Sequence, residues 1–392
     1  MLATVKDLMK KADLLLLGLC VAANLYGILL IYSATRYKDS LHTAPLKQAV
    51  AMALGLVCYF VVTHLDLNLI MTKWKWILGF SLVFIGLLRT PLGMADDTGN
   101  LNWLDIPGIP FNLQPAEFVK ITFILLLAKQ IVWLQESRHG ISSVPSVAFL
   151  GGHVLFMVAF IFLISGDLGM ATVYCFVFTI MCWVGRVNKW WFITVGGGLA
   201  GMVLVLWNLV LPKTRFWTDY RIMRFRVLFD HDLDPMDKGW QQGRSLLAIG
   251  SGQITGQGYL NGTQTQSISN SSLPARHTDF IFAVCGEELG LIGCCILLLL
   301  LTAIILRCFY IGIRAENTFS ALVAIGIGGM LLTQVALNVA MCLYVAPVIG
   351  ITLPFFSYGG SSTLTMYIAM GIVSGVHSRI LPSWLQNRSR QR

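Results

Sequence analysis

Charged side chains are scarce in this chain of 392 residues: they make up 12% of it, against about 25% in a typical soluble protein. Hydrophobic residues make up 56%, and the mean hydropathy is +0.72. This balance argues against a soluble enzyme and is typical of a chain that folds in a lipid bilayer.

Clustered cysteines are also absent. Of the nine cysteines, only Cys294 and Cys295 are close neighbours, and all nine fall inside apolar runs. Isolated cysteines in such runs are small apolar packing residues, so we expect neither a disulfide framework nor a metal site. No small-residue cleavage site follows the first apolar run, which predicts an uncleaved first helix.

Long apolar runs are what the chain has in abundance. A run of about 20 apolar residues crosses roughly 30 Å of hydrocarbon, and ten candidates can be counted. We find no internal repeat and no soluble domain. The prediction is therefore an all-α polytopic membrane protein, a single transmembrane domain over residues 1–392. The predicted spans are residues 14–34, 45–64, 75–94, 113–134, 144–165, 167–186, 189–211, 279–306, 318–343 and 357–378.

Basic residues indicate the orientation. They gather before the first span, in the loops from even to odd spans and in the tail, whereas the short odd-to-even loops carry few. Because positive charge accumulates on the cytoplasmic side, both termini are predicted to be cytoplasmic. The net charge of +9 then reflects topology, and we expect no nucleic-acid partner.

The same topology makes residues 212–278, between predicted helices seven and eight, a long outer loop. Its segment WTDYRIMRFRVLF alternates Arg221, Arg224 and Arg226 with apolar residues, as a helix at a membrane interface does. Residues 229–237, FDHDLDPMD, lack the Gly and the terminal Glu of a calcium loop. We interpret them as solvated loop.

Ionisable residues inside spans cost roughly 2.5–3.5 kcal/mol each and mark sites by default. Glu117 and Lys120 lie three residues apart, on one helical face. Their pairing contributes only about 0.2–0.5 kcal/mol on an exposed helix, so they must face a wet cavity or other polar partners. Both a substrate cavity and a structural ion pair fit the pattern.

Other polar residues have simpler interpretations. Asp167, in a tight turn, suits a helix N-cap. Gln334 and Asn338 lie four apart, as in helix–helix hydrogen bonding. Residues 346–365, APVIGITLPFFSYGGSSTLT, contain prolines and glycines that predict irregular or re-entrant backbone.

The stretch LPARHTDFIFAVCGEELGLIGC places Asp279 at the outer tip of predicted helix eight, with Thr278 as a possible N-cap. Asp279 is either a helix-dipole partner or a general base. Behind it, small residues form a seam that admits a neighbouring helix or a lipid chain: Ala283, Gly286, Gly290 and Gly293.

Glu287 and Glu288 lie deeper in the same helix, and a structural role is at least as well supported there as catalysis. Taken together, the outer face carries an acid, a Glu/Lys pair and an arginine-rich strip, which suits chemistry on a lipid-linked anionic substrate. A transporter fits these residues almost as well.

Five segments resemble the SEDS family of shape, elongation, division and sporulation proteins: LQPAEFVKI, SGDLGMATV, AIGSGQITGQGYLNGTQTQ, LPARHTDFIFAVCGEELGLIG and LPFFSYGGSS. Their order and the ten-span layout agree over nearly the whole chain. The GTQTQ before LPARHTDF is more similar to the elongation branch, RodA, than to the division branch, FtsW. At Gln253 this chain departs from a Gly that is common in the family.

The resemblance implies a peptidoglycan glycosyltransferase that polymerises lipid II into glycan strands at the outer face of the bacterial cytoplasmic membrane, for elongation and rod shape. The family's essential aspartate falls on Asp279. Its other site positions fall on Glu117, Lys120, Asp167, Lys47 and Gln48. It also implies, as partners, a class B penicillin-binding transpeptidase and the membrane proteins of the elongation complex.

Our hypothesis is that Asp279 deprotonates the acceptor hydroxyl, while basic residues stabilise the departing pyrophosphate. The candidates for this second role are Lys120, Arg221, Arg224 and Arg244. No metal-ligand pattern is visible, and a divalent cation, Mg²⁺ or Mn²⁺, stays an alternative for sharing the work. A flippase for lipid-linked precursors is the rival function, and it predicts polar residues that continue through the membrane.

Overall fold

The computed structural model describes residues 12–38, 41–95, 100–108, 111–210, 223, 225–226, 228, 238–268 and 272–380. Each of the ten predicted spans coincides with a helix. These helices are α2 (Leu14–Thr35), α3 (Ala44–Thr63), α5 (Trp74–Gly86), α6 (Pro115–Glu136), α7 (Val144–Ser165), α8 (Leu168–Val184), α9 (Lys189–Val205), α12 (Ile281–Ile313), α13 (Thr318–Cys342) and α14 (Gly360–His377).

Six of these helices are long and apolar enough to cross a membrane: α2, α3, α7, α9 with its continuation to Leu209, α12 and α13. The chain is therefore a multi-pass helical membrane protein. The helix of the third predicted span ends early, at Gly86, and is followed by the 3-10 turn η2 (Leu87–Arg89). Strands β1 (Gly93–Ala95) and β2 (Leu101–Leu104) then pair antiparallel. The all-α expectation is corrected by this small hairpin.

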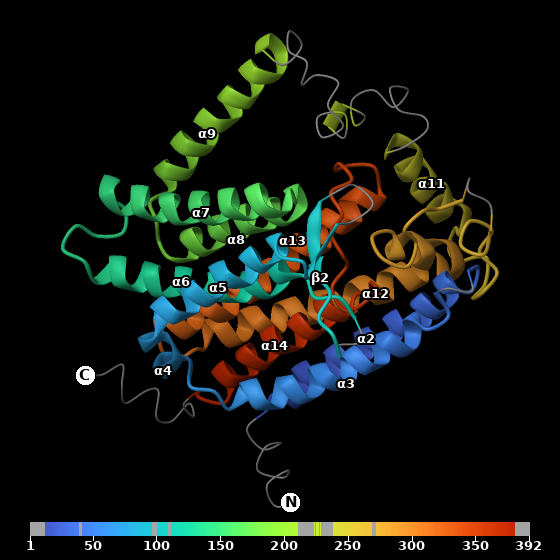
Figure 1. Ribbon diagram of the computed structural model, residues 1–392, viewed down its shortest axis with the longest axis horizontal. Helices are drawn as coiled ribbons and strands as arrows, with labels where there is room; N and C mark the ends of the chain where they lie inside the picture. Colours follow the sequence, from blue (N-terminus) through green and yellow to red (C-terminus); the bar gives the residue numbers. More distant parts are fainter. Residues whose placement is uncertain are drawn as a thin grey trace, which may run out of the picture.

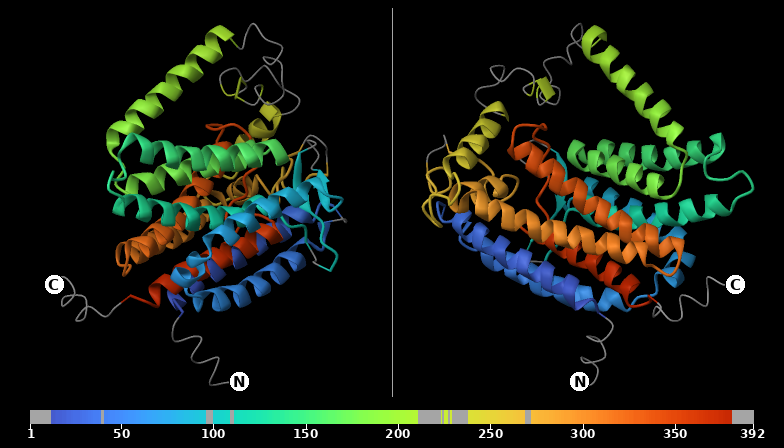
Figure 2. Two further views of the ribbon diagram at one scale, coloured as in Figure 1. Left: turned by 60° about the vertical axis from the view of Figure 1, so that its left-hand side comes forward. Right: turned by 180° about the vertical axis from the view of Figure 1, so that it is seen from behind.

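Helix α13 lies at the centre of the bundle, where it packs against α12, α8, α6 and α14 (Figure 1). Of the six long apolar helices it has the largest buried share, 61%. Helices α3 and α14 also pack closely, because Gly371 of α14 lies against the backbone of Tyr59 of α3. Helix α9, by contrast, projects away from the bundle and buries none of its residues (Figure 2).

Helix α12 is interrupted at Gly290, whose φ of 65° and ψ of −161° are not helical. The break frees backbone groups, and the segment after α11 (Lys238–Ser251) bonds to them. The N–H of Leu291 donates to the Gln253 carbonyl (2.9 Å), and the N–H of Gln257 donates to the Glu287 carbonyl (2.9 Å). An inserted loop therefore replaces the helix's own hydrogen bonds.

The glycine seam of α12 is filled by this same inserted segment. A Cβ added at Gly252 would lie 1.8 Å from the Gly286 carbonyl oxygen, and Gly286 faces Ile249 of α11. A Cβ added at Gly290 would likewise collide with the backbone of Ile254 and Gly256. The sequence predicts that the seam admits a neighbouring helix or a lipid chain. Helix α11 occupies it at Gly286, and the non-helical segment after α11 occupies it at Gly290, so neither position is open to a lipid chain.

Glu287 holds the loop that follows. Its carboxylate accepts hydrogen bonds from the N–H of Gln264 (2.6 Å), the N–H of Thr265 (2.8 Å) and the hydroxyls of Thr263 and Thr265 (3.1 and 2.6 Å). A buried carboxylate with this many donors is fully satisfied. The structural interpretation of Glu287 is therefore confirmed.

Glu288 ties the loop to helix α2. Its carboxylate accepts from the Ser33 hydroxyl of α2 (2.6 Å), the Leu260 N–H (3.2 Å) and the Gln266 side-chain amide (2.8 Å). Buried Arg276 closes the far side by donating to the carbonyls of residues 264, 265 and 267. Residues 238–268, which belong to the predicted long outer loop, thus form helix α11 and a loop that is docked on α12. Arg221, Arg224 and residues 229–237 lie outside the described residues.

We expect Glu287→Gln to loosen this loop. A glutamine keeps one acceptor oxygen and turns an NH₂ group toward other N–H donors, so the free energy of unfolding should fall by about 2–4 kcal/mol. The measurements are thermal unfolding in detergent and the rate of limited proteolysis between residues 252 and 267. Glu316→Gln, at an exposed position, is the matched control. Equal melting and cleavage in both variants would contradict the anchoring role.

Candidate functional site

Asp279 lies half-buried, two residues before the first residue of α12. The residue in the N-cap position is Phe280, which makes no side-chain cap bond. The Thr278 hydroxyl instead donates to the Ala275 carbonyl (3.2 Å). The interpretation of Thr278 as N-cap is therefore wrong, because its side chain stabilises the turn that precedes the helix.

Three consecutive carbonyls around Asp279 are fixed by other elements. The Tyr358 N–H donates to the His277 carbonyl (2.8 Å), the Ser357 hydroxyl to the Thr278 carbonyl (2.6 Å) and the Asn338 amide to the Asp279 carbonyl (2.8 Å). These three bonds fix the backbone from which the Asp279 side chain extends.

The segment between α13 and α14 supplies most of these anchors. It contains no helix over residues 343–359, which confirms the predicted irregular backbone. Asn338 bridges to it by donating also to the Ile351 carbonyl (2.7 Å). Gly350, at a φ of 68°, lies beside the carboxylate, since a Cβ added there would be 3.8 Å from Asp279 Oδ2. Glycine at this position keeps the space next to the acid open.

The start of α8 meets the same segment from the other side. A Cβ added at Gly169 would be 2.2 Å from the Ile349 carbonyl oxygen. Asp167 caps α8 by accepting from the Met170 N–H (2.9 Å), which confirms its N-cap interpretation. It also accepts from the Gln114 side chain (3.4 Å) and interacts electrostatically with Glu117. Asp167 therefore caps α8 and also lies close to Glu117.

Glu117 and Lys120 form an ion pair inside the bundle, with 2.7 Å between Glu117 Oε2 and Lys120 Nζ. Their side chains are 0% and 1% exposed, so they do not face lipid. Neither head group has a partner of hydrogen-bond geometry among the described residues. Because two buried charges need further hydrogen bonds to offset desolvation, the pair has capacity left for a polar ligand or water.

Gln334 of α13 is a site residue that the sequence pattern paired with Asn338. Their hydrogen bonding differs. The Asn338 amide donates to two carbonyls, whereas neither side-chain amide atom of fully buried Gln334 has a partner in the described part of the chain. Gly326 faces Ile124 of α6. The two helices run antiparallel, so about two turns further along α13 brings Gln334 level with Glu117.

The N-termini of α6, α8, α12 and α14 lie at this end of the bundle, together with the start of α3. The Gln114 N–H donates to the Ser361 hydroxyl (2.9 Å), which joins α6 to α14. From α3, the Gln48 amide donates to Thr363 (2.7 Å) and accepts from the Gly359 N–H (3.1 Å). Helix N-termini favour negative charge, so this end suits both the acids and an anionic substrate.

The remaining predicted contacts are less central. Lys47 is exposed at the start of α3, next to buried Gln48. Arg244 lies half-buried on α11, with its guanidinium 5.7 Å from the Trp240 ring. The structure therefore brings Asp167, Glu117 and Lys120 together, and residues 349 and 350 connect the start of α8 to Asp279. Lys47 and Arg244 lie on α3 and α11.

Two further features of the site are its potential metal ligands and the histidine next to Asp279. Within the described ranges, no three His, Cys, Asp or Glu side chains are grouped as metal ligands. Burial, and secondarily Arg276, lowers the pKa of His277 to about 4. The imidazole next to the site therefore carries no charge at pH 7.

The comparisons with known proteins fit this arrangement. A family described as "Cell cycle protein", which covers FtsW, RodA and SpoVE, matches residues 12–380. The chain belongs to this family. It is 32% identical to the stage V sporulation protein E of Bacillus subtilis over 93% of its own length and 96% of the relative's. It is 31% identical to the peptidoglycan glycosyltransferase MrdB of Escherichia coli K12, over 93% of each.

Solved structures agree. A chain of a peptidoglycan synthase complex matches with a TM-score of 0.76 and 28% identity, over 93% of this chain and 97% of that one. The rod shape determining protein RodA of Thermus thermophilus matches with a TM-score of 0.65 and 26% identity, over 95% and 98%. Division and sporulation relatives are both 32% identical, so overall identity does not separate the branches.

We expect Gln334→Met to stabilise the protein. Methionine has a similar volume, and removing a buried amide without partners should raise the free energy of unfolding by about 1–3 kcal/mol. Thermal unfolding of the purified protein measures this. Thr333→Val is the neighbouring control, because its hydroxyl is already bonded to the Gly329 carbonyl (2.8 Å). A lower melting temperature for Gln334→Met would mean that the amide holds the fold together.

Proposed function

We propose that this chain is a peptidoglycan glycosyltransferase that polymerises lipid II into glycan strands. Relatives named for that activity align with it over nearly its whole length. The observation that carries the proposal is Asp279, an acid at the start of α12 that lies beside Gly350 and whose backbone is fixed at the carbonyls of residues 277, 278 and 279.

In the proposed reaction the Asp279 carboxylate takes the proton of the acceptor's GlcNAc 4-hydroxyl. The resulting oxygen attacks the anomeric carbon of the donor's MurNAc, and a new C–O bond forms there. The bond from that carbon to the pyrophosphate oxygen breaks, and undecaprenyl pyrophosphate leaves with the electron pair. A single displacement inverts the α-linked donor and gives the β-1,4 link.

The leaving pyrophosphate needs positive charge. Lys120, with hydrogen-bonding capacity unused, and the gathered helix N-termini are the described groups that supply it. Arg221, Arg224 and Arg244 of the outer segment stay candidates for the same role, and Lys47 for substrate binding. A divalent cation, Mg²⁺ or Mn²⁺, would rest mainly on the substrate's own oxygens, because the described residues offer no ligand cluster.

The setting of the enzyme follows from the same proposal. We place the chain, as one transmembrane domain with ten spans, in the bacterial cytoplasmic membrane, with both termini cytoplasmic and Asp279 on the outer face. The GTQTQ segment supports the elongation branch. A related chain comes from a complex that coordinates polymerization and crosslinking, which supports a class B transpeptidase as a partner. The family resemblance alone leads us to propose elongation-complex membrane proteins as further partners.

We expect Asp279→Asn to lower strand synthesis by about 10²–10⁴-fold, because general acid–base help is worth that much. The assay is polymerisation of lipid II by protein purified in detergent, with and without its transpeptidase. Asp66→Asn is the control, since exposed Asp66 only caps a short helix and asparagine caps equally well. Near wild-type activity in a folded Asp279→Asn protein would exclude the base role.

The same assay tests the rival function. Detergent removes the two compartments that a flippase needs, so glycan strands made in detergent must come from polymerisation and not from lipid flipping.

The ion pair gives a second test. Glu117→Gln or Lys120→Met alone leaves one buried charge and should cost about 3–5 kcal/mol of stability. The double variant removes both charges, so its melting temperature should return toward wild type while polymerisation stays low. Unfolding scans and the lipid II assay on all three proteins decide. A double variant that regains both stability and activity would show that the pair is purely structural.

A further inference from the structure

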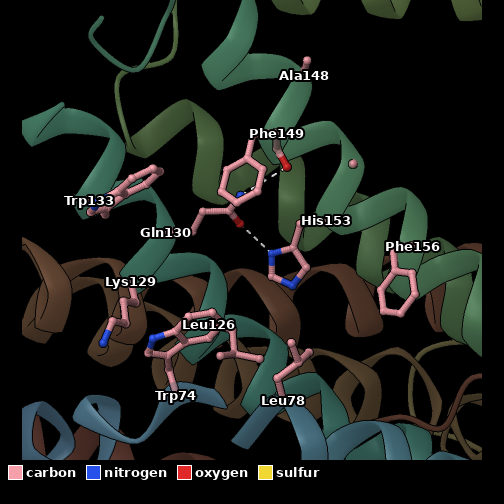
Figure 3. A pocket seen from close by; sticks show the side chains of 11 residues that line it. Trp74, Leu78, Leu126, Lys129, Gln130, Trp133, Ala148, Phe149, His153 and Phe156 are labelled. Carbon is pink, nitrogen blue, oxygen red and sulfur yellow. Dashed lines mark hydrogen bonds between the residues drawn. The ribbon is translucent and has the colours of Figure 1, made fainter. Parts of the chain in front are cut away.

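A second cavity lies on the flank of the bundle, between α5, α6 and α7. It has a volume of about 740 Å³, which is within the usual range of roughly 300–1,000 Å³ for ligand pockets. Its residues on α6 lie in the C-terminal half of that helix, whereas Glu117 and Lys120 lie in the first two turns. The cavity is therefore separate from the site at Asp279. Figure 3 shows the lining side chains.

The wall of this groove is apolar. Trp133, Phe149 and Phe156 are half or more exposed, so the groove opens on the surface that faces lipid. Its polar side chains are paired within the wall: Gln130 donates to the Phe149 carbonyl (3.2 Å), and its amide oxygen is 2.6 Å from His153 Nδ1 (Figure 3). What the groove presents to an occupant is hydrocarbon and aromatic surface, which suits an acyl chain.

One end of the groove is basic and aromatic. Lys129, which donates to the Met71 carbonyl, lies beside Trp74 there, and Trp133 lies one turn further along α6 (Figure 3). Exposed Lys73 and Lys75 flank Trp74 in the chain. Tryptophan marks the membrane–water boundary, and basic pockets between transmembrane helices bind anionic lipid head groups. This end therefore combines an interfacial depth with the charge that a phosphate diester requires.

A smaller groove of about 460 Å³ flanks the other side of α5, and Lys73 lines it. Because Lys73 and Trp74 are consecutive, the basic ends of the two grooves adjoin at the start of α5. Two apolar grooves that share one basic end match the shape of a lipid with two chains and one charged head group.

We propose that an anionic diacyl glycerophospholipid binds astride α5. One acyl chain lies in the groove of His153 and Gln130, the other in the groove lined by Phe80 and Thr122, and the phosphate lies between Lys73, Lys75 and Lys129. The site does not depend on the proposed reaction, since it is separate from Asp279 and shares only helix α6 with the acid–base machinery.

The test uses the full-length protein, delipidated in detergent and titrated with phosphatidylglycerol or phosphatidylcholine of identical chains, with bound lipid counted by native mass spectrometry. Phosphatidylglycerol should bind more tightly. Lys129→Gln should weaken its binding by about fivefold, as expected for one lysine near an anionic head group, and should leave phosphatidylcholine unchanged.

Two neighbouring glycines of α7 provide the matched variants. A Cβ added at either Gly151 or Gly152 meets nothing within 4 Å, so neither position opposes the start of a side chain, but only Gly152 lines the groove. Gly152→Phe should fill the groove and displace the bound lipid, whereas Gly151→Phe should bind like wild type. Equal binding of the two lipids, or equal binding by the two glycine variants, would overturn the proposal. Displacement by inorganic phosphate alone would do so too, since it would indicate an anion site without a lipid.

Discussion

The hydrogen bonds that complete α12 at its break are the constraint on which the architecture of the outer end depends. A helix interrupted inside a membrane exposes N–H and C=O groups that lipid cannot satisfy. Here residues 253–258 satisfy them, and Glu287 and Glu288 hold the same loop from below. The first turns of α12 are thereby free to take their own direction, with Asp279 at their tip. Without the inserted loop, neither the break nor the position of the acid would be stable.

The acids of this protein divide into two groups by what surrounds them. Glu287 and Glu288 are surrounded by N–H and O–H donors, so their charge is fully used in holding backbone. Asp279 has its backbone fixed instead, and Glu117 shares a buried pair that lacks further donors. An unmet hydrogen bond in a buried place is costly, so the pair, which lies close to Asp167, has unused capacity for a polar partner. Chemistry and structure thus use the same residue types in different hydrogen-bond environments.

Glycine performs related tasks at the two ends of this arrangement. Gly252 and Gly290 let one backbone lie directly on another, where a single Cβ would collide. Gly350 has a left-handed φ and leaves room beside the carboxylate of Asp279. Gln253 has a φ of 49°, a conformation that costs a non-glycine residue roughly 1–2 kcal/mol. This explains why the resembling family commonly has glycine at that position.

The ten helical segments, the irregular stretch before α14 and the candidacy of Asp279, Asp167, Glu117 and Lys120 could all be read from the amino-acid sequence. Apolar run length, proline and glycine placement, and the cost of charge in lipid are local properties, which a linear pattern records. The β-hairpin before α6, the helix α11, the anchoring by Glu287 and Glu288 and the different fates of Gln334 and Asn338 could not be read in this way. Apart from the local hairpin, these depend on partners far apart in the chain, such as Ser33 with Glu288 or Asn338 with Asp279. Hydrogen bonds of this kind are determined by which helices pack together, and no spacing along a single helix contains that information.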